Sequence, residues 1–339
     1  MNNIEDIWQT CMGNSYWRNG PVLNNAVSGI DEALWDIKGK AANMPVYELM
    51  GGKCRAAVAA YGAAQGKTLQ ELGDRVEENL RNGIVHTRLG LGYLGDEHTL
   101  APLHKPEGTP AYGLYFDPRQ KMAETLEMLR YLRNRFGNKT ELMVDVHEKL
   151  APSDAVRFAR ELEPYNLFFI EDILPVEHLD WMKRIREVSS TPMAIGELFN
   201  HPREWQQLII NREIDFIRCH ISQLGGLTPA KKLAVFCEAF GVRTAWHGPG
   251  DLTPIGMAAQ LHLDLTSPNL AIQEFSSFPA EIRRVFPGAP ELRDGYLYVN
   301  ENPGLGVDFD EDAAAEFPYK EPAKDMFQFR LPDGTPVKS

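Results

Sequence analysis

Several features that would assign this chain to a particular class of protein are absent from its sequence. The four cysteines form no CxxC pair, and no Gly-x-Ser-x-Gly or Walker phosphate-loop segment occurs. There is no Lys/Arg run, and the formal net charge is −12, so the electrostatic signature of a nucleic-acid-binding protein is missing. No stretch reaches the roughly 18 apolar residues of a membrane span, and the N-terminus lacks the basic-then-apolar order of a signal peptide. The sequence therefore predicts neither a nucleic-acid nor a membrane partner.

The composition is that of a globular protein with one large core. Of the 339 residues, 43% are hydrophobic and 24% are charged. An α/β barrel takes about 250 residues, which leaves room for one accessory region. The cysteines lie in or beside apolar segments, which favours buried, reduced thiols and a cytoplasmic protein; they are Cys11, Cys54, Cys219 and Cys237.

Short apolar runs alternate with amphipathic helical stretches between about residues 58 and 290, a pattern typical of βα units around a parallel sheet. Two folds accommodate such units, a closed (β/α) barrel and an open doubly wound sheet. The eight predicted strands are Val58 to Gly62, His86 to Gly92, Glu141 to His147, Leu167 to Asp172, Pro192 to Leu198, Asp215 to Ser222, Val242 to Gly248 and Leu270 to Ser277.

The spacing of polar residues favours the barrel. Asp145, Glu171 and Glu197 follow one another at equal intervals, and the interval from His247 to Glu274 is one residue longer. Each lies at or near the C-terminal end of a predicted strand. Because the strand ends of a barrel meet at one mouth, whereas those of an open sheet spread along an edge, the repetition predicts a barrel with a site at its mouth.

Asp145, Glu171 and Glu197 are the candidate metal ligands, since they end consecutive predicted strands. Carboxylates that converge inside an apolar barrel repel one another unless a hard cation neutralises them. Magnesium prefers oxygen ligands and keeps positions open for water and substrate. Any one of these acids could instead cap the following helix, but the matched spacing favours a Mg²⁺ site.

Two histidines and an arginine are candidate reactive groups beside that metal. His147 follows Asp145 by two residues, so strand alternation predicts that both side chains point to the same face. His247 ends the seventh predicted strand, and either histidine could instead satisfy a loop backbone group. Arg218 suits a substrate carboxylate or hydroxyl, although pairing with Glu274 alone would also satisfy it.

The remaining segments frame the predicted barrel. The long connection Gly92 to Pro118 is rich in Gly and Pro and leaves a strand at its catalytic end, which predicts a lid or a disordered insert. Residues 1–53 show helical spacing, and residues 291–339 read as irregular segments. We therefore predict three regions: a partial N-terminal capping domain over 1–53, the barrel over 54–290, and a C-terminal segment over 291–339 that packs with the cap.

Several segments resemble the mandelate racemase branch of the enolase superfamily, and within it the mannonate dehydratase-like (starvation-sensing protein) group. The resemblance covers essentially the whole chain and implies a modified TIM barrel of the (β/α)7β type. The family's N-terminal domain begins with a three-stranded sheet, and this chain starts within the helical part that follows it. The segments that carry the resemblance are Ala33-Leu34-Trp35-Asp36, Pro45 to Gly52, Asp145-Val146-His147, Glu171-Asp172, Gly196-Glu197 and His247 to Pro254.

The resemblance also implies a function. It implies Mg²⁺-dependent dehydration of a sugar acid such as gluconate or mannonate, by α-proton abstraction through a metal-stabilised enediolate, to give a 2-keto-3-deoxy acid. The alternatives are a racemase or epimerase that uses His147 and His247, and a metal-binding homologue with little or no dehydratase activity. We expect a cytoplasmic homo-oligomer. The implied residues are Asp145, Glu171 and Glu197 for the metal, His147, Arg88 and His247 for catalysis, and Arg218, His247, Asp251 and Glu274 for the substrate.

This chain departs from the group in two places. Arg88 matches the arginine of the group's Arg/Tyr pair, but the position of the tyrosine holds Leu100. The stretch that normally supplies a substrate-contacting histidine after the first strand reads Tyr61-Gly62-Ala63-Ala64-Gln65. Both departures bear on which sugar acid is accepted.

Overall fold

The computed structural model describes residues 3–14, 16–92, 106–108, 114–250, 252–275, 277–319, 321 and 329–337. The chain divides into two compact units. Unit 1 comprises Met1–Tyr61 and Ile195–Pro318, and unit 2 comprises Gly62–Ala194 and Tyr319–Ser339. Among the described helices, none is both long enough and apolar enough to cross a lipid bilayer.

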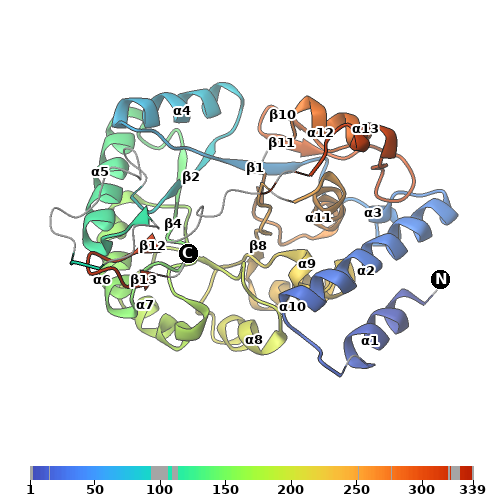
Figure 1. Ribbon diagram of the computed structural model, residues 1–339, viewed down its shortest axis with the longest axis horizontal. Coiled ribbons are helices and arrows are strands. Elements are labelled where there is room, and N and C mark those ends of the chain that lie inside the picture. Colours follow the sequence, from blue (N-terminus) through green and yellow to red (C-terminus); the bar gives the residue numbers. More distant parts are fainter. Residues whose placement is uncertain are drawn as a thin grey trace. The chain divides into compact units, whose positions relative to one another are not determined.

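Unit 2 is built from parallel strands that alternate with helices (Figure 1). Strands β2 and β4 pair in parallel from His86↔Glu141 to Gly90↔Asp145, β4 pairs with β5, and β5 pairs with β6. The elements are α4 (Leu69–Arg81), β2 (His86–Gly90), β3 (Leu114–Tyr115), α5 (Pro118–Phe136), β4 (Glu141–Asp145), α6 (Pro152–Leu162), η2 (Glu163–Tyr165), β5 (Phe169–Glu171), η3 (Val176–Trp181), α7 (Met182–Val188), β6 (Met193–Ile195), β12 (Phe329–Arg330) and β13 (Pro336–Val337).

Two helices of unit 2, α4 and α5, begin at residues whose side chains cap them. The Thr68 hydroxyl accepts a hydrogen bond from the backbone N–H of Glu71 at the start of α4. Asp117 does the same for the first turn of α5, which has Pro at its first position. These helices bury apolar faces, and the strands are apolar on both faces, as buried parallel strands are.

The C-terminal residues 329–337 belong to unit 2. Strand β12 pairs in parallel with β3 and antiparallel with β13. The Phe329 ring contacts Phe116 edge-on, with ring centroids 6.2 Å apart. It also lies 3.9 Å from the Lys149 ammonium. This pairing fixes the segment that directly precedes α5.

Unit 1 combines a helical N-terminal part with the remaining βα elements. Figure 1 shows α1 and α2 side by side. Strand β1 pairs in parallel with β9 and antiparallel with β11, and β7 pairs in parallel with β8. The elements are α1 (Ile4–Asn14), α2 (Pro21–Ala42), α3 (Val46–Leu49), β1 (Val58–Ala63, ending in unit 2), α8 (Pro202–Ile210), β7 (Phe216–Ile217), α9 (Ile221–Leu224), α10 (Leu227–Phe240), β8 (Arg243–Thr244), α11 (Pro254–Thr266), β9 (Gln273–Glu274), α12 (Ala280–Val285), β10 (Glu291–Arg293), β11 (Tyr296–Tyr298) and α13 (Glu311–Ala315).

The core of unit 1 forms around α11, nearly all of whose residues are buried. The segment after β11 returns to the N-terminal helices, since Gly304 bridges to Pro45 and the backbone N–H of Leu305 donates to Asp36. The core cluster contains Tyr47, Val58, Ala60, Met257, Leu261, Leu265, Leu270 and Leu297.

Each predicted strand run contains an observed strand, and all of these strands except β1 are shorter than predicted. Pairing of β4, β5 and β6 stops at their C-terminal ends because the backbone turns there: His147, Asp172 and Gly196 all have positive φ. The prediction that residues 291–339 are irregular was wrong in part, since this segment contains the β10–β11 hairpin and α13. The prediction that the cysteines are buried was wrong for Cys54, which is exposed, and Cys11 is only partly buried, whereas Cys219 and Cys237 are buried. The boundaries at residues 53 and 290 stay a prediction.

Candidate metal centre and active site

The C-terminal ends of β4 and β5 place two predicted ligands side by side in unit 2. Asp145 ends β4 and Glu171 ends β5, and the two residues are register partners in the parallel pairing. Beyond them the chain stays hydrogen-bonded, because the Val146 N–H donates to the Glu171 carbonyl. The sheet therefore fixes the positions from which the two carboxylates project.

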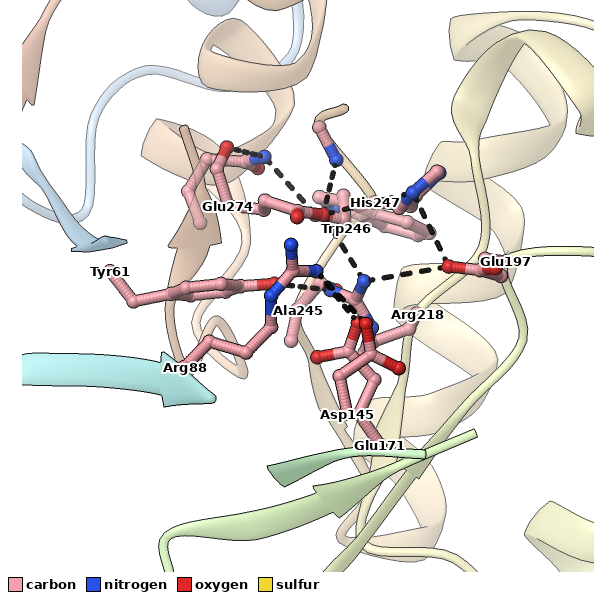
Figure 2. A network of polar contacts seen from close by, with 12 residues as sticks. Tyr61, Arg88, Asp145, Glu171, Glu197, Arg218, Ala245, Trp246, His247 and Glu274 are labelled. Carbon is pink, nitrogen blue, oxygen red and sulfur yellow. Dashed lines mark hydrogen bonds and ion pairs between the residues drawn. The ribbon is translucent and has the colours of Figure 1, made fainter. Parts of the chain in front are cut away.

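The Arg88 guanidinium of β2 faces both carboxylates (Figure 2). Its Nη1 lies 3.1 Å from Glu171 Oε1 and 3.6 Å from Asp145 Oδ2. The Glu171 side chain is fully buried, whereas that of Arg88 is 23% exposed. Asp145 and Glu171 are thus paired with the positively charged Arg88 side chain, which remains in contact with solvent.

These acids fit a hard cation. Asp145 Oδ1 is buried and has no hydrogen-bond partner among the described residues. A buried carboxylate oxygen left in that state is costly unless a ligand occupies it. The Glu171 and Asp172 carboxylates also offer oxygens within 4.8 Å of each other. Oxygen-only donors of this kind suit Mg²⁺ better than zinc or copper.

One prediction about the neighbours of these acids needs correction. The alternation argument for His147 was wrong, because β4 ends at Asp145 and His147 has φ +53°. Its position is set by a left-handed turn, in which the Glu148 N–H donates to the Asp172 carbonyl.

In unit 1, Glu197 follows β6 directly after a glycine turn. Gly196 has φ +136°, and a Cβ there would meet the Phe199 ring at 3.0 Å and the Cys219 nitrogen at 3.3 Å. A glycine is therefore required at the residue that orients Glu197. The Arg218 N–H donates to the Ile195 carbonyl, which places Arg218 next to this turn.

Arg218 is fully buried and joins several groups of unit 1 (Figure 2). Its Nη2 lies 3.1 Å from Glu274 Oε2 and 3.9 Å from Glu197 Oε2. Its Nη1 donates to the Tyr61 hydroxyl oxygen at 2.7 Å. The predicted pairing with Glu274 is present, and the substrate contact stays a prediction.

His247 lies beside the same acids. Its Nε2 is 3.3 Å from Glu197 Oε2 and 3.9 Å from Glu274 Oε2. The Gly248 N–H donates to Glu274, and the Gln260 amide donates to the His247 carbonyl. The peptide unit between His247 and Gly248 is thus held at both its carbonyl and its N–H, which fixes the backbone that carries this histidine.

Some predicted positions lie outside the described residues. They are Asp251, Leu100 and most of the connection from Gly92 to Pro118. The His220 Nδ1 caps α9 by accepting a hydrogen bond from the Ser222 N–H, and Cys219 is buried. Sequence reasoning missed Tyr61 as part of the site. Its signal was its place near the end of the first strand, as the first residue of the stretch compared with the family pattern.

Comparisons with known proteins agree in sequence and in structure. Residues 76–313 match the family described as "Enolase C-terminal domain-like", and residues 1–51 match "Mandelate racemase / muconate lactonizing enzyme, N-terminal domain". A "D-galactonate dehydratase family member" of Enterocloster bolteae is 52% identical, covering 100% of this chain and 84% of that protein. A relative with the same family description from Pantoea ananatis is 48% identical, over 98% of this chain and 83% of that protein.

Solved structures give the same result. An enolase from Pantoea ananatis with bound D-gluconate and Mg is 46% identical to this chain, with a TM-score of 0.94. The match covers 99% of this chain and 84% of that one. A mandelate racemase/muconate lactonizing enzyme from Jannaschia sp. CCS1 is 23% identical, with a TM-score of 0.82, over 96% and 82% of the two chains, and shows the fold alone.

Proposed function

Because this chain belongs to the mandelate racemase/muconate lactonizing enzyme family of the enolase superfamily, we propose that it is a Mg²⁺-dependent dehydratase of a gluconate- or mannonate-like sugar acid. The resemblance and the fold class predicted from the sequence are both confirmed by these matches. The relatives named D-galactonate dehydratase family members support the reaction class, and the neighbour with D-gluconate and Mg supports the ligand class.

One observation in the chain itself carries the proposal. Two carboxylates end neighbouring parallel strands as register partners, and one buried oxygen, Asp145 Oδ1, has no hydrogen-bond partner among the described residues. We assign Asp145, Glu171 and Glu197 as the metal ligands. When bound, Mg²⁺ supplies a fixed positive charge that makes the proton next to a chelated carboxylate easier to remove.

The remaining groups would handle protons and orientation. Dehydration removes the proton at the carbon next to the carboxylate and expels the neighbouring hydroxyl together with a proton. His147 is assigned as the base, His247 as the group facing the departing hydroxyl, and Arg88 as a catalytic cation near the substrate. Arg218, Asp251 and Glu274 are assigned to the substrate's other oxygens. Since the net reaction releases water and no proton, one base and one acid suffice.

The test is a panel of sugar acids, including gluconate, mannonate and galactonate, incubated with the protein and Mg²⁺. We expect a 2-keto-3-deoxy product from at least one of them, and EDTA should abolish its formation. Asp145→Asn should lower kcat/KM by at least about 100-fold, because it removes a charged ligand. Asp74→Asn is the matched control, since Asp74 is an exposed aspartate that pairs with Arg135.

Two outcomes would contradict the dehydratase. Exchange of the α-proton with deuterated solvent without loss of water would indicate the racemase or epimerase alternative. Calorimetric binding of a sugar acid without any chemical change would indicate the metal-binding homologue. Equal activity of Asp145→Asn and Asp74→Asn would remove Asp145 from the ligand set.

The assembly and location of the protein are separate proposals. We propose a cytoplasmic homo-oligomer, and the free state of the cysteines in the described part of the chain supports a reducing compartment. Light scattering coupled to size exclusion measures the oligomeric state, and a single species at the mass of one 38.2 kDa chain would contradict it.

A further inference from the structure

Tyr61 is a buried tyrosine whose hydroxyl meets a charged group of the site. It lies on β1, opposite Glu274 in the parallel pairing with β9. The residue is 2% exposed, and its hydroxyl oxygen accepts a hydrogen bond from Arg218 Nη1 at 2.7 Å. A hydrogen bond with a charged partner is among the stronger ones, and losing it in a buried place leaves a donor unsatisfied.

The geometry of Arg218 shows what this contact controls. Nη2 lies 3.1 Å from Glu274, within hydrogen-bond range, but 3.9 Å from Glu197. The other arm has the Tyr61 hydroxyl at 2.7 Å and the Ala245 carbonyl only at 3.5 Å. Because a guanidinium is planar and rigid, fixing one arm also fixes the other. Tyr61 therefore limits how closely Arg218 approaches Glu197.

We propose that Tyr61 is a positioning residue of the metal site: it holds Arg218 against Glu274 and so keeps the Glu197 carboxylate available to the metal. The inference rests on the proposed function in one respect, the assignment of Glu197 as a ligand. Without the hydroxyl, the guanidinium can move to hydrogen-bond Glu197 and compete with the cation. Loss of the hydroxyl should therefore weaken Mg²⁺ binding.

The test compares Tyr61→Phe with Tyr47→Phe in the full chain. Tyr47 is also 2% exposed in unit 1, and its hydroxyl contacts Glu301, whose side chain is 69% exposed. Titration calorimetry without substrate measures the Kd of Mg²⁺. We expect Tyr61→Phe to raise that Kd about tenfold, which is about 1.4 kcal/mol, and Tyr47→Phe to change it less than about twofold.

A double-mutant cycle tests whether Tyr61 acts through Arg218. Lysine lacks the second arm, so adding Tyr61→Phe to Arg218→Lys should change the Kd of Mg²⁺ by less than about twofold. Should Tyr61→Phe fail to fold, 3-fluorotyrosine at position 61 keeps the shape and weakens the acceptor oxygen. The Kd should then rise about two- to threefold.

Two results would overturn the proposal: an unchanged Kd of Mg²⁺ in both Tyr61 variants, or the same rise in the Arg218→Lys background. A protein that turns over no sugar acid but shows the tenfold rise would contradict the proposed function and leave the positioning role intact. The metal titration therefore separates the two failures.

Discussion

Arg88 in unit 2 and Arg218 in unit 1 each face two acidic side chains, yet their surroundings differ. Arg88 is 23% exposed and lies 3.1 Å and 3.6 Å from Glu171 and Asp145. Arg218 is fully buried and has a tyrosine hydroxyl and a backbone carbonyl as additional partners. A buried cation with several fixed partners is a permanent structural part of a site, whereas a solvent-accessible cation can be displaced by another cation.

Replacing each of the two arginines should have the largest effect on the free energy of unfolding. Arg218→Met leaves buried carboxylates without their cation, which costs about 3–5 kcal/mol of the free energy of unfolding. Arg88→Met should cost less, since its site is open to solvent. Mg²⁺ should restore the stability of Arg88→Met, because it replaces the lost charge, but not that of Arg218→Met. Urea unfolding with Mg²⁺ or with EDTA measures both; equal losses with equal recovery would refute the distinction.

A second contrast lies between a buried and an exposed histidine. Burial lowers the pKa of His262 from 6.5 to about 4. The contacts of the ring favour its neutral form, because Nδ1 accepts a hydrogen bond from the Tyr47 N–H and therefore carries no proton. The other nitrogen, Nε2, lies 3.2 Å from the Leu305 carbonyl oxygen. Between pH 6.5 and 4 the unfolded chain binds the extra proton. The contribution of neutral His262 to the free energy of unfolding is therefore complete above pH 6.5. It decreases by an amount of order 3 kcal/mol as the pH falls from 6.5 to 4.

Urea midpoints measured from pH 7 to pH 4 check this expectation. His262→Gln should flatten the decrease in stability relative to the unsubstituted protein, whereas His178→Gln, at an exposed position, should leave it unchanged. An identical slope in both variants would mean that His262 does not titrate as its contacts imply.

The smallest expected effect concerns the glycine turns. Gly196→Ala should cost about 2–3 kcal/mol, since φ is +136° and the new Cβ meets Phe199 and Cys219. Gly241→Ala, with φ +75° and no described heavy atom within 4 Å of the new Cβ, should cost about 1 kcal/mol. Thermal unfolding gives the difference. A larger loss for Gly241→Ala would show that close contact is not what restricts residue 196.

The sequence was a good guide to strands and a poor guide to where they end. All the predicted strand runs contain a strand, because apolar runs bounded by polar residues are a local signal. The runs were extended too far because apolar residues continue past the last pairing, as Val146 does after Asp145. Whether a residue pairs depends on its neighbour strand and on the sign of φ, which hydrophobicity does not encode. The strand-alternation argument for His147 failed for this reason, because β4 ends before that residue.

Residue types and their spacing along the chain were enough to predict the family, the order of the βα elements, and the acids at the ends of β4 and β5. Three contacts became visible only in the folded chain: Arg88 faces Asp145 and Glu171, Arg218 is buried against Glu274, and the Tyr61 hydroxyl accepts a hydrogen bond from Arg218. Tyr61 and Arg218 are far apart in sequence, and no periodic pattern relates residues that meet only when strands pair. Burial, which separates the two arginines, is likewise a property of the packed chain and not of either residue.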